Sequence, residues 1–259
     1  MEFPLSILLL LCLFFFLAGL VDSIAGGGGL VTVPAMLVCG IPPHAALGTA
    51  KFASTLGMLT SLWTFARSRL IVTSIAPLGF AASFLGAVGG SSLTMLIDSA
   101  ILGKLLIFLL PVGMVISLFS RRSTACEESL PPRFLKLKVF LLCLTIGMYG
   151  GFFGPGTGSF FILAQNLVLR MGLVRASATA KIFNLASNTG ALTTFATGGV
   201  VLWSLGLPLA AANILGNQAG VRLAIRVGAK AVRTFLYITL SLLTATLIYR
   251  FFPSIGSLI

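Results

Sequence analysis

Long apolar runs separated by short polar stretches make up most of the chain. They fall at about residues 4–21, 29–39, 46–66, 70–97, 99–119, 139–153, 158–169, 176–197, 199–221 and 231–252. A helix needs roughly 20 residues to cross the hydrocarbon core of a bilayer, and most of these runs reach that length. The runs at 29–39 and 158–169 are too short to cross as straight helices. The pattern predicts an all-α integral membrane protein with about ten transmembrane segments, two of them short or broken.

Composition points to the same class. Hydrophobic residues make up 58% of the chain and charged residues only 8%, whereas a soluble domain carries about 25% charged residues. The net charge of +12 comes from basic residues spread over several short loops, which is typical of membrane topology and not of a nucleic-acid partner. The first apolar run follows Glu2 without a preceding Lys or Arg, so we expect a retained transmembrane helix and not a signal peptide.

The two halves of the chain match each other. Gly26 falls on Gly156, and the segment Ala46 to Lys51 falls on Ala176 to Lys181 with Ala, Thr, Ala and Lys at the same places. Biased composition produces scattered Ala and Leu matches, but it does not readily align two membrane lysines and two glycine clusters in one frame. The match predicts two transmembrane repeats, residues 1–119 and 139–259, joined by a central basic cytoplasmic loop at residues 120–138.

The loop charges predict how the two repeats are oriented. If the short runs cross, each repeat has five crossings and the second repeat is inverted; if they do not cross, each has four and the repeats are parallel. The ten-crossing arrangement puts most of the 17 cations on one side, where positive loops are cytoplasmic. We therefore expect inverted repeats in a bacterial cytoplasmic membrane, with both termini outside. The cations on that side are Arg67, Arg69, Arg121, Arg122, Arg133, Lys136, Lys138, Arg170, Arg175, Arg222, Arg226, Lys230 and Arg233.

Glycines interrupt the helical pattern at equivalent places in the two halves. The first interruption is the run Gly26–Gly29, and the second is GFFGPGTGS at residues 151–159. Broken helices occur in membranes only where the backbone is buried in protein or lines a polar cavity, and paired breaks in inverted repeats point to a binding site near the midplane. The helix after each break would turn free N–H groups toward that site, which favours an anion. Tight helix packing alone is the other interpretation.

Two lysines follow the breaks. Lys51 and Lys181 lie inside apolar runs, where a cation is costly unless it faces a cavity or a partner. Snorkelling to the interface would explain one such lysine, but two at equivalent positions predict a shared anion site. The expected substrate-binding residues are Gly26, Gly27, Gly28, Gly29, Thr49, Lys51, Ser54, Gly154, Gly156, Gly158, Thr179, Lys181, Asn184 and Asn188.

Acidic residues and cysteines are scarce. Of the five acids, Asp22 directly precedes the glycine run, where it caps the broken helix or takes part in proton coupling. Four cysteines without a CxxC pair and a single His predict neither a metal site nor a cofactor. Because no Walker motif, nucleophile elbow or HExxH motif occurs, we expect a protein that is not an enzyme.

The stretch AGGGGLVTVPAMLVCGIPPHAALGTAKFAST and its echo GGFFGPGTGSFFI…ASATAKIFNLASN resemble the sulfite exporter TauE/SafE family of membrane anion carriers. The resemblance covers nearly the whole chain. It implies a carrier for sulfur-containing or organic anions, such as sulfite, thiosulfate or sulfonates.

We therefore expect a secondary transporter that moves a small anion by alternating access between the two repeats. The resemblance implies that this anion is a sulfur oxyanion or an organosulfonate, with a proton or a sodium ion as the co-transported partner to be tested. Two alternatives stay open. A lipid-phosphate translocase would hold a headgroup in the same cationic cavity, and a membrane assembly or thiol-redox factor would depend on the cysteines. The sequence does not indicate an oligomeric state.

Overall fold

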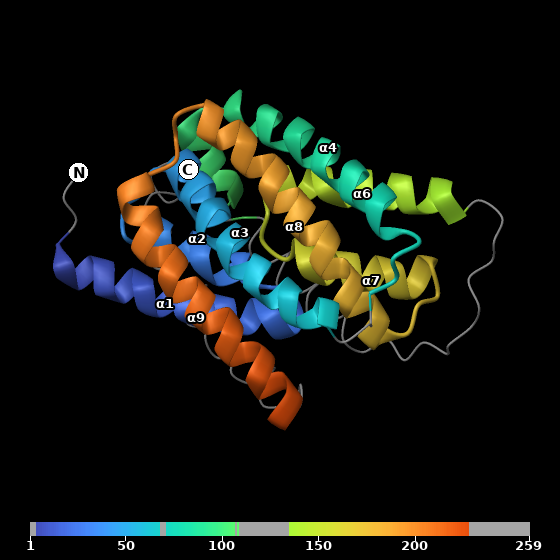
Figure 1. Cartoon of the computed structure of the whole chain (residues 1–259). Coiled ribbons are helices and arrows are strands. Elements are labelled where there is room, and N and C mark those ends of the chain that lie inside the picture. Colours follow the sequence, from blue (N-terminus) through green and yellow to red (C-terminus); the bar gives the residue numbers. More distant parts are fainter. Residues whose placement is uncertain (1–3, 68–70, 107, 109–134, 228–259) are drawn as a thin grey trace.

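A computed structural model describes residues 4–67, 71–106, 108 and 135–227, which form helices and their connections (Figure 1). Residues 99–106 are helical, and the longer or well-bounded helices are α1 (Leu5–Ala25), α2 (Gly29–Val38), α3 (Pro43–Arg67), α4 (Ala76–Met95), α6 (Leu135–Phe152), α7 (Thr157–Val168), α8 (Leu173–Thr197) and α9 (Trp203–Val227).

The helices follow the predicted apolar runs closely. The two short runs become α2 and α7, of 10 and 12 residues. Helix α6 begins at Leu135, so residues 135–138 are helical and not part of the predicted loop. Leu and Lys both favour helices, and a lysine can extend its ammonium beyond apolar surface, so the charges of LKLK do not delay the helix start. The rest of the predicted loop, residues 109–119 and the run at 231–252 lie outside the described residues.

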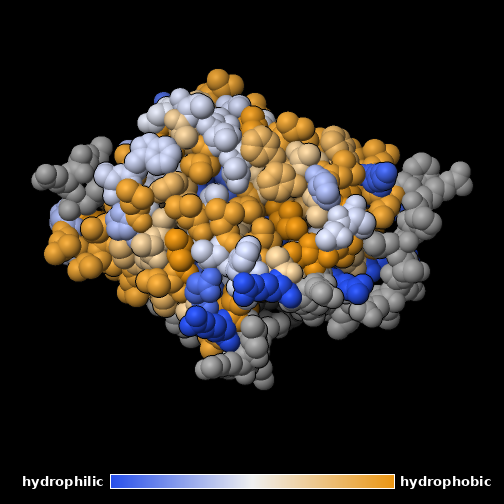
Figure 2. Space-filling view, in the orientation of Figure 1, coloured by the Kyte–Doolittle hydropathy of each residue, from blue (hydrophilic) through white to orange (hydrophobic). Residues whose placement is uncertain are grey.

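Three of the described helices, α1, α4 and α6, are long and apolar enough to cross a membrane by length and composition. Each presents large apolar side chains outward, including Leu9, Leu85 and Leu141. The face in Figure 2 is accordingly mostly apolar, with strongly hydrophilic side chains mainly along its lower part. Helices α3 and α8, of 25 residues each, are less apolar because they carry buried polar side chains of the interior.

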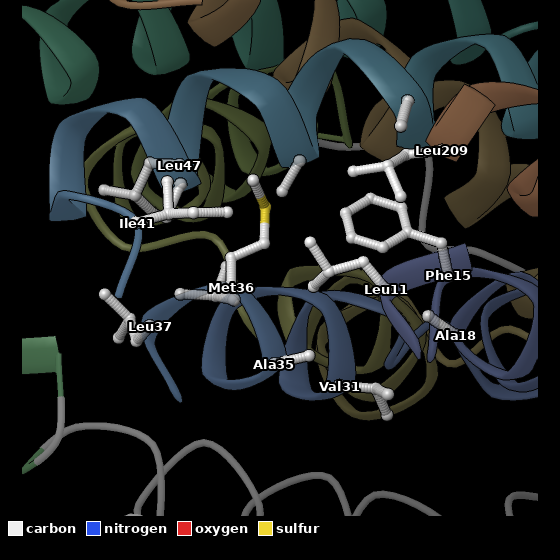
Figure 3. Packing of buried hydrophobic residues seen from close by; sticks show 14 of the residues in the cluster. Leu11, Phe15, Ala18, Val31, Ala35, Met36, Leu37, Ile41, Leu47 and Leu209 are labelled. Carbon is white, nitrogen blue, oxygen red and sulfur yellow. The ribbon is translucent and has the colours of Figure 1, made fainter. Parts of the chain in front are cut away.

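Two hydrophobic cores hold the helices together, and each combines helices from both halves of the chain. The first core joins mainly α1, α2, α3 and α9, with Phe15, Met36 and Leu209 packed together (Figure 3). The second core joins α4, α6, α7 and α8, with Cys143 and Phe183 among its buried residues. Each core thus combines both halves: the first takes α9 and part of α8 from the second half, and the second takes α4 from the first half. The two halves are therefore interlocked.

Glycines show the direction in which neighbouring helices run. Gly216 packs on the backbone of Phe16, and Gly220 one turn later packs on Leu20, so α1 and α9 run in the same direction. The same contacts form between α4 and α6, where Gly86 and Gly90 pack along the α6 backbone in order. Because a Cβ at any of these glycines would overlap backbone atoms of the neighbouring helix, the close approach requires glycine.

The central helices α3 and α8 run in opposite directions. Gly48, early in α3, lies beside Phe195, late in α8, whereas Lys51 bonds to the earlier Asn188. Helices α3 and α9 are parallel, because residues 49 and 57 of α3 contact residues 202 and 213 in the same order. Helices α4 and α8 are also parallel, because Gly79 and Met95 of the first helix contact Phe183 and Gly198 in the same order. The long helices therefore form two sets of opposite direction, with α1, α3 and α9 in one and α4, α6 and α8 in the other.

Candidate functional site

The two glycine breaks meet where the halves of the protein join. Gly26 ends α1 with a φ of 72°, and Gly156 precedes α7 with a φ of 82°, a backbone conformation that favours glycine. A Cβ at Gly26 would lie 2.7 Å from the carbonyl carbon of Gly158, and one at Gly29 would lie 3.1 Å from the Cα of Pro155. The backbones of the breaks are thus in direct contact, and the N-terminal ends of α2 and α7 come together there.

A small pocket with a cavity volume of about 30 Å³ lies against this junction. Ten residues expected from the sequence line it, and they come from both halves. These residues are Asp22, Gly26, Gly29, Lys51, Ser54, Gly154, Gly156, Gly158, Asn184 and Asn188. Apolar neighbours such as Phe153 and Leu47 complete the wall. A second, smaller pocket shares Gly26, Gly158 and Asn184 with the first.

Lys51 places an ammonium group in the main pocket. It lies on α3, is 7% exposed, and its Nζ donates a hydrogen bond of 2.8 Å to Oδ1 of Asn188 on α8. A Cβ at Gly154 would lie 3.0 Å from this Nζ, so the second glycine break gives the ammonium its space. Asn188 is a neutral amide and supplies a hydrogen bond without a compensating charge.

Lys181 has a different environment. It is 2% exposed, lines the smaller pocket, and its Nζ donates to the backbone oxygen of Asp22. The same Nζ lies 3.8 Å from Oδ2 of Asp22. Lys181 therefore sits at the C-terminal end of α1, where the helix dipole favours a cation, and it forms an ion pair with Asp22. The sequence predicted that both lysines face one cavity, but in the structure only Lys51 lines the main pocket.

Asp22 links the end of α1 to the start of α2. Its Oδ1 accepts the backbone N–H of Gly28 at 3.2 Å, which is the contact of a capping carboxylate at a helix N-terminus. Its other oxygen faces Lys181, so one carboxylate connects the first glycine break to α8 of the other half. Asp22 is 7% exposed.

Four of the expected site residues do not line either pocket. Gly27 and Gly28 begin α2 through backbone bonds. Thr49 and Thr179 were predicted to contact the anion; this stays a prediction, and in the structure both hydroxyls accept backbone N–H groups. The Thr49 hydroxyl accepts the N–H of Leu202 at 3.0 Å, and the Thr179 hydroxyl accepts the N–H of Val72 at 3.1 Å. Both N–H groups lie just ahead of a helix, where the backbone has no helical partner.

The sequence reasoning missed Thr32. This residue is fully buried in α2 and lines the main pocket, and among the residues that the structure describes its hydroxyl has no hydrogen-bond partner. A buried hydroxyl without a partner is costly, so this donor is available to a bound ligand. The internal match could not reveal Thr32 because the equivalent position holds Ile162. The detectable signal was a lone hydroxyl in the apolar segment that follows the glycine run.

The pocket is suited to an anion. Its donors are the ammonium of Lys51, the amide of Asn184, the hydroxyl of Thr32 and the start of α2 beside Gly29. Charge-assisted hydrogen bonds from ammonium groups and helix N-termini are among the strongest that an anion can receive. The two lysines and Asp22 are the charged residues that line the two pockets.

An apolar helical exterior around a buried polar pocket between two interlocked halves defines an integral membrane protein of the transporter class. The family model "Sulfite exporter TauE/SafE" matches residues 11–247, and the chain belongs to that family.

Similar proteins are described as probable membrane transporters. The chain is 36% identical over 251 residues to the probable membrane transporter protein YfcA of Escherichia coli K12, covering 95% of this chain and 92% of YfcA. It is 36% identical over 252 residues to a probable membrane transporter protein of Haemophilus influenzae, covering 96% and 97% of the two chains. A probable membrane transporter protein ORF9 of Sinorhizobium sp is 38% identical over 227 residues, covering 86% and 85%. No solved structure matches the chain significantly.

Proposed function

We propose that the protein is a secondary transporter that moves a small anion, a sulfur oxyanion or an organosulfonate, across the cytoplasmic membrane by alternating access. The observation that carries this proposal is the buried pocket in which Lys51 and the unpartnered hydroxyl of Thr32 face the junction of the two glycine breaks. The family description, which names sulfite, supports a sulfur oxyanion as the cargo.

The anion would be held by one positive charge and by hydrogen-bond donors that come from both halves. In this proposal the Lys51 ammonium binds one anion oxygen, while Thr32 and Asn184 donate hydrogen bonds to the others. The glycine breaks let the backbone approach closely, and Ser54 and Asn188 complete the polar wall. Sulfite, thiosulfate and sulfonates present several oxygens around one sulfur, so they can use several convergent donors at once.

The helix directions support ten crossings and inverted repeats. Helices α1 and α3 run the same way, so the chain between them must travel back across the protein, and α2 is the segment that makes this return. The same holds for α7 between α6 and α8. Equivalent helices α3 and α8 run in opposite directions, which is the arrangement that an axis in the membrane plane produces.

The position of the pocket supports alternating access. Helices α3 and α8 cross at the pocket, and the helices α4 and α9 each pack in the core formed mainly by the other half. A rocking motion of one core against the other would expose a ligand at this junction to each side in turn. Both termini would then lie outside and the loop at residues 120–138 in the cytoplasm. Thiol labelling of single-cysteine variants at residues 125 and 200 would test this.

The test of the proposed function is anion flux into proteoliposomes. We expect saturable flux of at least one of sulfite, thiosulfate, isethionate, sulfoacetate or sulfate, measured with and without gradients of protons and sodium to identify a coupling ion. Protein-free liposomes and the Lys51→Met variant should show background flux, and Lys138→Met, which removes an exposed lysine at the start of α6, should match the parent. Absence of flux for every anion with correctly folded protein would contradict the proposal and favour a lipid headgroup as cargo.

A further inference from the structure

The two lysines of the site differ in charge compensation. Lys181 is paired with Asp22 through an ion pair and a hydrogen bond to its backbone oxygen. Lys51 is bonded to a neutral amide, Asn188. At the position equivalent to Asp22 the second half holds Phe152, and at the position equivalent to Asn188 the first half holds Met58. The two halves therefore supply two equivalent cations, but only Lys181 has an acidic partner, Asp22, which has no equivalent in the other half.

We propose, on the basis of the proposed function, that Asp22 determines which anion charge the site prefers. The Asp22–Lys181 pair stays closed and leaves Lys51 as the single uncompensated cation, so the site selects a monovalent anion over a divalent one. Asp22 is thus a specificity-determining residue that does not itself bind the anion.

The pair is held in place by more than its own attraction. Asp22 is fixed by the N–H of Gly28, and Lys181 is fixed by the backbone oxygen at the end of α1. Both side chains are buried, and opening a buried pair leaves two unpaired charges at a high cost. A cargo would have to replace all of these contacts in order to use Lys181. Lys51, by contrast, already faces the pocket together with Thr32 and Asn184.

The charge sum decides which anion is favoured. The pockets hold two lysines and one carboxylate, which is a net charge of +1. A monovalent anion brings the buried site to neutrality, whereas a divalent anion leaves one negative charge in a region of low dielectric. Uncompensated buried charge is strongly unfavourable. The selection needs no difference in cargo size or shape.

A matched pair of probes tests this directly. Isethionate and sulfoacetate have the same two-carbon sulfonate skeleton, but at pH 7 the first carries one negative charge and the second, with its ionised carboxylate, carries two. We expect the parent protein to transport isethionate at least tenfold more efficiently than sulfoacetate in proteoliposomes. Asp22→Asn raises the site charge to +2 while Asn can still cap α2, so the preference should fall at least tenfold. Asp22→Asn/Lys181→Met restores +1 and should restore the parental preference.

The control is Asp98→Asn. Asp98 also accepts a backbone N–H at a helix start, that of Ala100 at 2.8 Å, but it is exposed and lies outside both pockets. This variant should keep the parental preference. Binding is measured in parallel as thermal stabilisation of each purified variant by the two probes, so that loss of folding is recognised.

The failure of this inference is distinguishable from failure of the proposed function. Efficient flux of sulfoacetate by the parent, or an unchanged preference in Asp22→Asn, would overturn the charge rule while the protein remains an anion transporter. No flux and no stabilisation by either probe, together with no flux in the wider anion panel, would overturn both.

Discussion

Lys51 and Lys181 occupy equivalent positions in nearly identical local sequences, Thr-Ala-Lys in each half, yet they have different partners. Lys51 bonds to an amide in the main pocket, whereas Lys181 is neutralised by Asp22 beside it. The difference arises at the partner positions, where one half has Asp22 and the other Phe152. The two halves thus share a frame, and a few substitutions give the two equivalent cations different partners.

The threonines two residues before the lysines show the opposite behaviour. Thr49 and Thr179 each accept a backbone N–H from the other half, at 3.0 and 3.1 Å. Their donors, Leu202 and Val72, are also equivalent positions. Contacts that hold the halves together are therefore duplicated, while contacts that face the pocket have diverged.

The difference between the two lysines is tested most strongly by a double variant that moves the uncompensated positive charge from Lys51 to Lys181. Lys51→Met/Asp22→Asn keeps the net charge of +1 but places it on Lys181. We expect flux to stay at the background level of Lys51→Met, a loss of roughly 30-fold or more, because removing a buried charged partner costs about 2–5 kcal/mol. Flux is measured in proteoliposomes. Recovery of parental flux would show that charge alone, and not the position of Lys51, defines the site.

The contact between the two breaks is tested by Gly26→Ala. The new Cβ would meet the Gly158 backbone at 2.7 Å and also adopt a positive φ, so we expect a destabilisation of ~2–4 kcal/mol from overpacking and backbone strain together. Gly40→Ala is the matched control, since Gly40 has a φ of 81° with nothing within 4 Å. It should lose only ~1 kcal/mol. Thermal unfolding in detergent measures both, and equal losses would contradict a collision between the breaks.

A smaller effect is expected when the amide partner of Lys51 is removed. Asn188→Met makes this position the same as its equivalent, Met58, and takes the 2.8 Å hydrogen bond from the ammonium. A hydrogen bond to a charged group is worth ~1.5–3 kcal/mol, so the apparent affinity for the anion should fall about tenfold or more. Concentration-dependent flux measures it. Unchanged affinity would show that Asn188 does not position Lys51.

The smallest effects, and nearly equal ones, are expected for Thr49→Val and Thr179→Val. Each leaves one N–H between the halves without its acceptor, which costs ~1–3 kcal/mol. Thr145→Val is the control, because the Thr145 hydroxyl bonds within its own helix. Thermal unfolding of the three variants should show matching losses for the first two and little change for the third. A loss of stability in only one of these two variants would contradict the equivalence of the two contacts.

The sequence determined the elements and many of the residues that line the main pocket. Apolar runs fixed the helices because lipid exposure and helix length constrain composition directly, and the short runs became α2 and α7 as predicted. The glycine breaks and Lys51 could be identified because a broken helix and a buried cation are both costly in a membrane. The internal match singled out residues from both halves that line the main pocket.

Only the tertiary structure decided how these residues are paired. The Asp22–Lys181 contact joins residues 159 positions apart, and no local pattern states which of two equivalent lysines meets an acid from the other half. The partners of Thr49 and Thr179 could not be predicted for the same reason, since these backbone N–H groups belong to the opposite half. Thr32 lines the main pocket because packing buries it there, and its hydroxyl has no partner among the described residues. Local propensities set the helices, but the crossing of the two halves sets which side chains meet.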